Sequence, residues 1–387
     1  MSHSEEAPKV LGSQAGAFTR RQFLGAAGAG VLSLTVLQSA MTTPAQASTG
    51  PSVGGTLNWL GWSGEDAEAQ TKSWLAANHV TLNRTYMSGQ SDILNALEVG
   101  KPLDLVNPYN GYISVLYDAG LIQPIDLSKV PNFSGLFSVI KHAKWLRSPK
   151  GEVLAVPDIW GDGPYIANPT HLPGAVPKSI LGLADAKWHK QVVWLDDPYT
   201  TIYGFGTALK FPHPNMITRE QLNQIIKAAR PVMKNVVSIA SGFSDAADLL
   251  IRGEASLSPI GWEAMLVQGQ KAGAALVKGY FIDFGVAYCD NYAIPKASTN
   301  VDTAHAYINE VISARVNSAV ATALQSGAVT RPAYNDLSTA EQKLYDYSIV
   351  DSSHPPVPIV ISTPPQTPPK GIMGNTDWVK AWDGLKS

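Results

Sequence analysis

Tyr288-Cys289-Asp290-Asn291-Tyr292-Ala293-Ile294-Pro295 is the stretch that best indicates how this chain folds and what it binds. It holds one acid, two aromatic rings and the only cysteine of the chain. The apolar run 281–287 before it predicts a buried strand. An ionised acid beside a buried strand needs a cationic partner, because carboxylates are almost never fully buried unpaired. Asp290 therefore predicts either an internal ion pair or a positive ligand, with a surface acid as the ordinary alternative.

The composition around this stretch bounds the class of protein. The chain has 387 residues, 45% of them hydrophobic, and a formal net charge of −2. That length is enough for two cores of ordinary domain size. No basic stripe suggests nucleic acid, so that partner class is set aside. A single cysteine, Cys289, excludes an internal disulfide, a Cys-rich zinc site and a Cys-ligated iron–sulfur cluster, and it is expected to pack in the core.

The first residues have the features of an export signal. Thr19-Arg20-Arg21-Gln22-Phe23-Leu24 precedes an apolar run at 25–37, and Pro44-Ala45-Gln46-Ala47 has the small residues of a cleavage site. The paired arginines resemble a Tat leader, which exports folded proteins. The apolar run is too short for a stable transmembrane helix. We therefore expect residues 1–47 to be a Tat signal peptide and the mature protein to be periplasmic, without a lipid anchor.

Strands and helices alternate along the chain. Apolar strands are expected at 56–62, 80–87 and 103–106, with helices between them, the first beginning at Ser63; this order is typical of a parallel sheet. A second α/β region starts near 163, and its strand 192–195 ends in Asp196-Asp197. The chain crosses between the regions near 161–164 and again at 281–295. The expected fold is α/β with two lobes, made of 48–162 and 291–335 (lobe 1) and of 163–290 and 336–387 (lobe 2), the latter ending in a proline-rich tail and a terminal helix.

Several segments resemble the periplasmic spermidine/putrescine-binding proteins of ABC importers. The resemblance keeps their order and spacing over most of 56–330 and implies a type II periplasmic binding protein fold, with two crossover strands in the hinge and a ligand clamped between the lobes. The segments are Leu57-Asn58-Trp59, Asp104-Leu105-Val106-Asn107-Pro108, Gly120-Leu121-Ile122-Gln123-Pro124-Ile125-Asp126, Val156-Pro157-Asp158-Ile159-Trp160-Gly161, Asp196-Asp197, Gly253-Glu254 and Asp290-Asn291-Tyr292-Ala293-Ile294-Pro295.

The resemblance also implies a ligand site, in which aromatic rings flank a linear amine and carboxylates hold its ammonium groups. A cation–π contact contributes about 0.5–2 kcal/mol and a charged hydrogen bond about 1.5–3 kcal/mol. By position, the first-lobe wall is formed by Trp59 and Trp62, and the second lobe supplies Asp197 and Trp262. The aromatic-x-acid pair is Tyr288 and Asp290.

Some positions depart from the family's pattern. Tyr109 stands in a Tyr-Asn-Gly where the family has Ser-x-Tyr, and Thr200 stands where the family has a second acid. Glu263, beside Trp262, is a candidate to replace that acid. The site therefore predicts an amine or organic cation more than spermidine itself.

Each site residue also has an ordinary structural alternative. The two tryptophans at 59 and 62 are three residues apart on a strand and so face opposite sides, which leaves a core position open for either. Trp262 suits a helix start in the core, and Asp197 suits a turn at Asp-Pro.

The function expected from these observations is the solute-binding component of an ABC importer. Its expected partners are a small cationic solute and a membrane permease, and the chain is expected to act as a monomer. No catalytic residue, metal or cofactor is expected, because the sequence lacks a Gly-x-Ser-x-Gly elbow, a phosphate-binding loop and His spacing for a metal. Two alternatives stay open: the same fold binding an amino-acid-like solute, a quaternary amine or a metal ion, and a Tat-exported enzyme.

Overall fold

The structure is a computed structural model that describes residues 53–87, 89–285, 287–353, 359, 363–365 and 367–387. The predicted signal peptide, 1–47, lies outside these residues. Contacts separate 1–50 from 51–387, and the description below concerns the second unit only. None of its described helices combines the length and apolarity that a membrane span requires.

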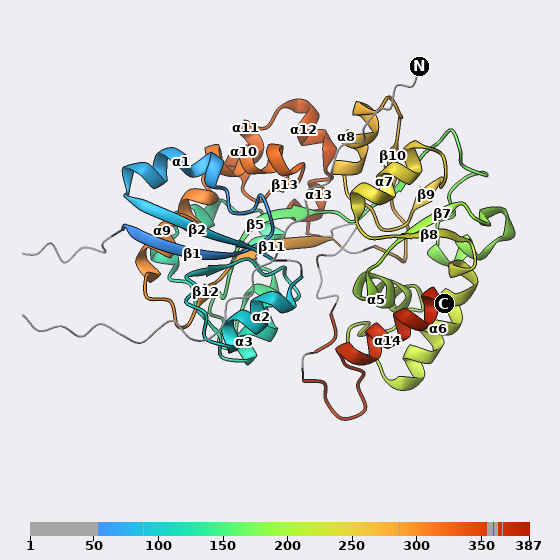
Figure 1. Cartoon of the computed structure of the whole chain (residues 1–387), viewed down its shortest axis with the longest axis horizontal. Coiled ribbons are helices and arrows are strands. Elements are labelled where there is room, and N and C mark those ends of the chain that lie inside the picture. The colour runs from blue at the N-terminus through green and yellow to red at the C-terminus, as the bar shows by residue number, and fades with distance from the viewer. Residues whose placement is uncertain (1–52, 88, 286, 354–358, 360–362, 366) are drawn as a thin grey trace, which may run out of the picture. The chain divides into compact units, whose positions relative to one another are not determined.

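The strands and helices alternate as the sequence predicts (Figure 1). The strands are β1 Gly55–Gly61, β2 Val80–Tyr86, β3 Leu105–Val106, β4 Ile122–Gln123, β5 Val156–Gly161, β6 Tyr165–Ala167, β7 Val192–Leu195, β8 Val236–Ala240, β9 Leu257–Ser258, β10 Val277–Gly279, β11 Tyr288–Tyr292, β12 Ile294–Pro295 and β13 Gly327–Ala328. The helices are α1 Glu68–Ala77, α2 Ser91–Glu98, α3 Ile113–Asp118, α4 Ser138–Lys141, α5 Pro198–Ala208, α6 Arg219–Met233, α7 Phe243–Ile251, α8 Ala264–Lys271, α9 Val301–Val311, α10 Ala314–Leu324, α11 Arg331–Asp336, α12 Thr339–Leu344, α13 Ser348–Asp351 and α14 Asn375–Lys386. Short 3₁₀ helices lie at Leu127–Lys129, Pro131–Gly135, Lys144–Leu146, Ile180–Ala184 and Ala186–Trp188.

The first core is built on a parallel sheet. Strand β1 lies between β2 and β3 and pairs in parallel with both, so Trp59 is in register with Arg84 on one side and Leu105 on the other. Leu57 and Trp59 share one face of β1 and are fully buried. Because parallel strands need helical crossovers, α1 and α2 connect β1 to β2 and β2 to β3. The carboxyl ends of these strands therefore meet at one edge.

A second core surrounds a five-stranded sheet with the order β10-β6-β9-β7-β8. Strand β7 pairs in parallel with β8 and β9, whereas β6 pairs antiparallel with β9 and β10. Trp194 of β7 is fully buried and stacks on Phe205 of α5, with ring centroids 5.9 Å apart. Since β7 is covered on both faces, its polar residues Asp196 and Asp197 appear only where the strand ends.

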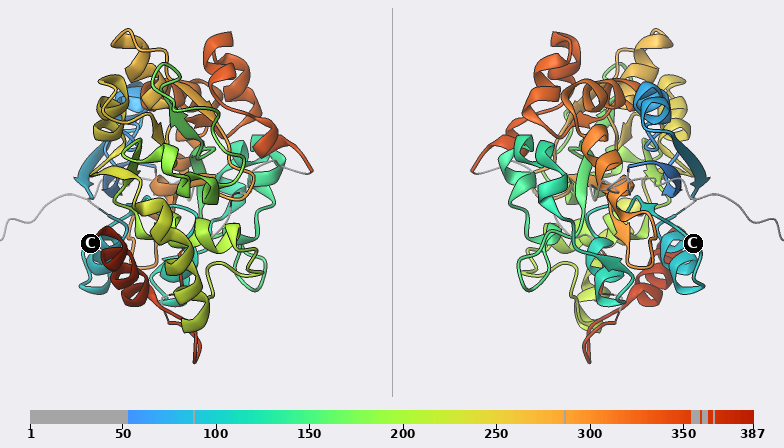
Figure 2. Two further views of the ribbon diagram at one scale, coloured as in Figure 1. Left: turned by 90° about the vertical axis from the view of Figure 1, so that its right-hand side faces the viewer. Right: turned by 90° about the vertical axis from the view of Figure 1, so that its left-hand side faces the viewer.

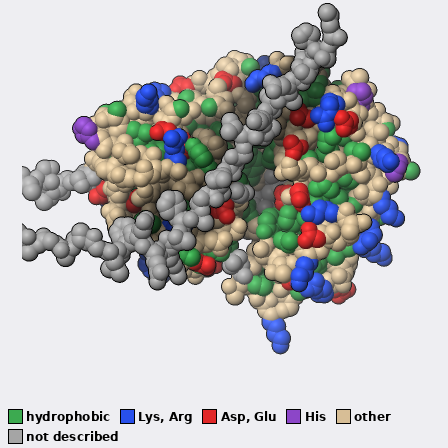
Figure 3. Space-filling model, viewed as in Figure 1, with side chains coloured by type: hydrophobic (Ala, Val, Ile, Leu, Met, Phe, Trp, Pro, Cys, Tyr) green, Lys and Arg blue, Asp and Glu red, His purple; other side chains and the backbone are tan. Residues whose placement is uncertain are grey.

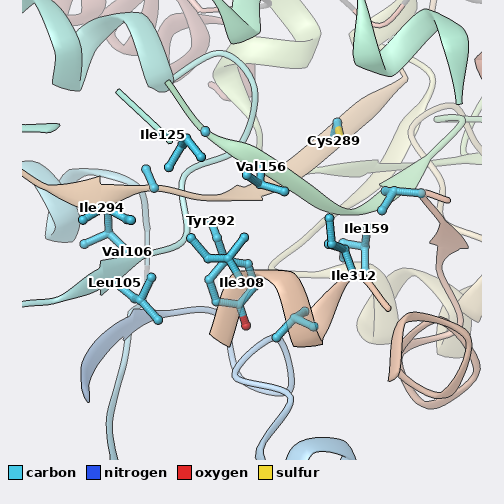
Figure 4. Packing of buried hydrophobic residues seen from close by; sticks show 14 of the residues in the cluster. Leu105, Val106, Ile125, Val156, Ile159, Cys289, Tyr292, Ile294, Ile308 and Ile312 are labelled. Carbon is cyan, nitrogen blue, oxygen red and sulfur yellow. The ribbon is translucent and has the colours of Figure 1, made fainter. Parts of the chain in front are cut away.

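Two neighbouring strands connect the cores. Strand β5 leads out of the first core to β6 of the second, and β11 returns beside it, antiparallel, with Cys289 opposite Trp160 and a bulge between Asp290 and Asn291. Cys289 is fully buried, as expected. Figure 4 shows Cys289 and Tyr292 on opposite sides of the β11 ribbon, with Tyr292 next to Ile308. This arrangement is the two-lobe α/β fold that the sequence predicts.

The prediction of a strand at 281–287 is wrong for 281–285, the continuous part of that run that the structure describes. Residues 281–285 are irregular, and the strand is β11 itself, the site stretch. Phe281 and Phe284 are buried because they pack into the second core as separate aromatic anchors, in edge-to-face contact 6.2 Å apart. Apolar residues in an irregular connection give the same sequence pattern as a buried strand.

The end of the chain contacts both cores, so the packing departs from the predicted division at 336. Cys289, beside Asp290 in β11, belongs to the first core, and so do Tyr345, Ile349 and Val350, although 163–290 and 336–387 were assigned to lobe 2. Helix α14 packs on the second core, beside α5 and α6 (Figures 1 and 2). Its Trp382 is buried, and the indole Nε1 donates to Asp196 Oδ1 at 2.6 Å. The tail thus docks a terminal helix on lobe 2, while the segment 336–351 packs with lobe 1.

Replacing Thr218 with Ala should lower the free energy of unfolding by about 1 kcal/mol, because Thr218 and Gln221 form a complete capping box at the start of α6. The Thr218 hydroxyl accepts from the Gln221 amide at 3.3 Å, and Gln221 Oε1 accepts from the Thr218 amide at 2.9 Å. Denaturant unfolding measures the loss. Thr218→Ser keeps the hydroxyl and should stay near wild type; an equal loss in both variants would contradict the capping role.

Candidate ligand-binding site

A cavity of about 550 Å³ is lined by residues of both cores. Figure 3 shows the surface hollowed between the two halves of the molecule on this face. The structure brings seven of the nine predicted site residues to the cavity wall: Trp62, Tyr109, Asp197, Thr200, Trp262, Tyr288 and Asp290.

The wall is formed where parallel strands end. Trp62 directly follows β1, Asp197 follows β7, and Trp262 comes shortly after β9. In open α/β sheets, ligands bind outside the carboxyl ends of the strands, so the topology of both sheets points these loops at one place. The site is therefore a consequence of strand direction in two sheets that are far apart in sequence.

Trp59 is not part of the wall, contrary to prediction. Its side chain is fully buried in the first core and meets the ring of Tyr86 edge-on, at a centroid distance of 6.1 Å. The reason is that side chains of a strand alternate between its two faces, so Leu57 and Trp59 of β1 both point into the core. Trp62 lies after the last residue of the strand, so this alternation does not fix its direction. Of the two tryptophans, Trp62 lines the cavity.

Glu263 also does not reach the cavity wall. Its side chain is fully buried, and Oε1 lies 3.0 Å from Lys278 Nζ, which also bonds Asp162 Oδ2 at 3.0 Å. Tyr280 donates its hydroxyl to the same Asp162 oxygen at 2.6 Å. Burial, followed by the neighbouring Asp162, raises the pKa of Glu263 well above its usual value. The proposed replacement acid is thus held inside the protein by its contact with Lys278 and is unavailable to a ligand.

Asp290 lies on the cavity wall with only 6% of its surface exposed. Strand β11 holds it opposite Ile159, and a β-bridge joins its backbone to Tyr109. Among the described residues, no Lys or Arg forms an ion pair with it. Burial raises the pKa of Asp290 to about 7. A positive group bound beside this carboxyl would lower its pKa and favour its ionised form.

Two further acids lie near Asp290 and were missed by the sequence analysis. Glu65 lines the cavity at 6% exposure, and Asp158 of β5 is fully buried. Burial, followed by the negative charge of Asp290, raises the pKa of both well above the ordinary range. The signal for Asp158 was present: an acid inside the apolar strand Val156–Gly161 is as unusual as Asp290 itself.

Long-range hydrogen bonds hold the loop that presents Trp62 and Glu65. The hydroxyls of Tyr292 and Tyr307 donate to the backbone carbonyls of Glu65 and Asp66. Residue Ala67 takes the left-handed conformation, with φ of 51°, so the helix predicted from Ser63 begins at Glu68 instead. The loop is fixed from the core side, which leaves its other side to the cavity.

Asp197 has two roles in the structure. It is the N-cap of α5, where its Oδ1 accepts from the amides of Tyr199 at 2.8 Å and Thr200 at 3.1 Å. It also lines the cavity, and no Lys or Arg of the described chain forms an ion pair with it. Burial raises its pKa above the ordinary value. The capping alternative and the site prediction are thus compatible.

Aromatic rings make up much of the remaining wall. Trp262 meets Phe243 edge-to-face at 5.7 Å, and both line the cavity from the second lobe. Tyr288 lies against β5, where a Cβ atom at Gly161 would come within 2.4 Å of its ring; only glycine at 161 allows this position. Rings of this kind pack against the flat or methylene parts of a ligand, and their faces attract a cation.

The stability of the protein without ligand should fall as the pH rises from about 5 to about 8. The pKa of Glu65, Asp158 and Asp290 is raised by folding, so the folded state binds protons more tightly than the unfolded state. Such stabilisation is complete below the unfolded pKa, about 4, and is lost as the pH rises through the folded pKa, about 7 for Asp290. Denaturant unfolding at both pH values measures the loss, which should be smaller in Glu65→Gln; equal losses would contradict the raised pKa of Glu65.

The described residues contain no group of three or more His, Cys, Asp or Glu side chains placed to hold a metal ion. Glu65, Asp158 and Asp290 therefore form a cluster of three acids that is not arranged as a metal site. Protons or a ligand's own N–H groups are the partners that suit them.

Comparisons with known proteins agree with this fold. The spermidine/putrescine-binding periplasmic protein of Salmonella typhimurium is 25% identical over 209 residues, 53% of this chain and 57% of that protein, and its counterpart in Escherichia coli gives the same figures. The chain thus matches a little over half the length of these curated relatives. These matches confirm the resemblance to polyamine-type binding proteins that the sequence predicts.

Solved structures share the fold over most of the chain. The spermidine/putrescine ABC transporter substrate-binding protein of Streptococcus pneumoniae has a TM-score of 0.67 at 15% identity, covering 85% of this chain and 97% of that structure. A second solved structure, described as the Atu4243–GABA receptor, has a TM-score of 0.62 at 17% identity and covers 77% of this chain and 90% of that structure. The family model described as bacterial extracellular solute-binding protein matches residues 69–344, so the chain belongs to the family of bacterial extracellular solute-binding proteins.

Proposed function

We propose that this chain is the solute-binding component of an ABC importer and that it captures a small organic cation between its two lobes. The observation that supports the cation best is Asp290: a buried carboxyl on the wall of an aromatic cavity, with no ion pair to a base in the described part of the chain. The names of the curated relatives, which bind spermidine and putrescine, support the same class of solute.

Binding follows from lobe closure in this proposal. Trp62 and Asp290 approach the ligand from the first lobe, and Asp197 and Trp262 approach it from the second. A ligand that touches both walls stabilises the closed arrangement, since it interacts with more protein there than in an open one. The permease of the importer is proposed to read the closed surface.

A thermal-shift screen tests the class of solute. The panel contains diamines, polyamines, quaternary amines, amino acids, sugars and organic anions, each at a concentration well above micromolar. A cation at about 100 times its dissociation constant stabilises the folded state by about 2.7 kcal/mol, which a melting curve resolves. Stabilisation by sugars or anions alone would contradict the proposal.

We further propose that residues 1–47 direct Tat export and that the mature chain works in the periplasm, free of a lipid anchor. The paired Arg20-Arg21 and the cleavage signal ending at Ala47 support this. Arg20→Lys with Arg21→Lys should keep the protein in the cytoplasm, as fractionation would show. Normal export of that variant would exclude the Tat route.

A further inference from the structure

The acids of the cavity are distributed unequally between the lobes. Glu65 and Asp290 line it from the first lobe, and Asp158 lies close enough that Asp290 helps to raise its pKa, while Asp290 and Asp158 both help to raise the pKa of Glu65. From the second lobe, the lining contains Asp197 as its acid, because Glu263 is bound to Lys278. Carboxyl groups are therefore concentrated at the first-lobe end.

The same end has buried acceptors that lack donors. Among the described residues, Glu65 Oε2 and both carboxylate oxygens of Asp158 make no hydrogen bond of normal geometry, although Asn107 lies close enough to offset part of the rise in the pKa of both acids. The side-chain oxygens of Asn107 and Asn291 also make no hydrogen bond of normal geometry to the described residues. Glu65 is 6% exposed and lines the cavity, so its carboxyl group lies at the wall that a ligand contacts. An unsatisfied buried acceptor is costly, and a primary ammonium group brings three N–H donors.

The second-lobe end has fewer acceptor atoms and less negative charge available to a positively charged group. Oδ1 of Asp197 already accepts two backbone N–H groups at the start of α5. The positive end of the α5 dipole further offsets the charge of this acid. Of the other second-lobe side chains on the wall, Phe243, Ile260 and Trp262 are apolar or aromatic, and Tyr199 and Thr200 bring only hydroxyls.

We propose that the site takes a primary or secondary amine with one positive head and an apolar or aromatic body. The head lies at Glu65 and Asp290, and the body lies between Trp62, Tyr288 and Trp262. Glu65 sets the specificity for N–H donors, since a quaternary ammonium group has none and cannot hydrogen-bond to the Glu65 carboxyl at the cavity wall. This inference rests on the proposed function and narrows it from organic cations in general to amines charged at one end.

Isothermal titration calorimetry with three probes tests the inference on the wild-type protein. The probes are 2-phenylethylamine, its N,N,N-trimethyl analogue and 1,4-diaminobutane. The expected order is 2-phenylethylamine tightest, by about tenfold or more over each of the other two. Tighter binding of the diamine or of the trimethyl analogue overturns the inference and leaves the proposed organic-cation function standing. No response to any amine at millimolar concentration contradicts both.

Two variants separate the ends of the site. Glu65→Gln should weaken 2-phenylethylamine by about tenfold or more, and the loss in Asp197→Asn, which keeps an oxygen for the α5 cap, should be several-fold smaller than the loss in Glu65→Gln. Equal losses in the two variants would indicate a clamp at both ends and overturn the inference. Glu65→Asp keeps the charge and should fall between wild type and Glu65→Gln, and a melting curve without ligand identifies any variant that fails to fold.

Discussion

Asp290→Asn should weaken the binding of the cationic solute by roughly 30- to 700-fold, or about 2–4 kcal/mol. The loss is large because Asp290 is 6% exposed, so its interaction with a cation takes place away from water. Asn has the same size but brings an N–H₂ group in place of a negative oxygen. Calorimetric titration of wild type and variant at about pH 8, where Asp290 is ionised, measures the difference.

The folded state supplies the control for this variant. Since burial raises the pKa of Asp290 to about 7, the ionised carboxyl is a cost to the protein without ligand at pH 8. Asp290→Asn should therefore be as stable as wild type or more stable there, while it binds far less tightly. A variant that binds as well as wild type would remove Asp290 from the site.

Lys278→Met should lower the free energy of unfolding by about 3–5 kcal/mol, because it removes one partner of a buried charge network. Lys278 Nζ bonds Asp162, Glu263 and the carbonyl of Leu344 at 3.0, 3.0 and 2.6 Å. Asp162 and Glu263 are fully buried and would lose their cation. Denaturant unfolding at about pH 8 gives the loss.

Two further variants test whether the loss in Lys278→Met comes from the unpaired acids. Lys271→Met removes an exposed lysine of the same lobe and should change stability by less than about 0.5 kcal/mol. Adding Asp162→Asn to Lys278→Met should recover part of the loss, since one unpaired carboxylate is then gone. A Lys278→Met variant as stable as Lys271→Met would show that the acids are satisfied without the lysine.

The network spans the region where the chain passes between the cores. Asp162 directly follows β5, Lys278 lies in β10 of the second sheet, and Leu344 ends α12 near the first core. Loss of the lysine should therefore weaken the contact between the lobes as well as lower the stability of each lobe.

The architecture was predictable because its signals are local. The alternating strands and helices and the terminal helix are confirmed in the structure. Each depends on periodicity or on residues three apart, which a sequence displays directly. The irregular anchors Phe281 and Phe284 were misread because burial without a strand leaves the same pattern.

The site was predictable in part, and its errors share a cause. Glu263 was a reasonable candidate until Lys278 and Asp162 were seen around it, and Asp162 is 101 positions earlier in the chain. The loop with Glu65 depends on the hydroxyls of Tyr292 and Tyr307, more than 200 residues away. Long-range partners decide which acid is neutralised, and residue type alone does not show them.

Proton release on binding tests the central claim most directly. Calorimetry of 2-phenylethylamine binding at about pH 6 and pH 8, in buffers of different ionisation enthalpy, counts the protons exchanged. Because the pKa of Asp290 is about 7 and a cation favours its ionised form, binding should release at least one proton at pH 6, the share from Asp290 should fall at pH 8, and binding should be several-fold weaker at the lower pH. Binding without proton release, at an affinity that is the same at both pH values, would contradict a buried carboxyl as the partner of the solute.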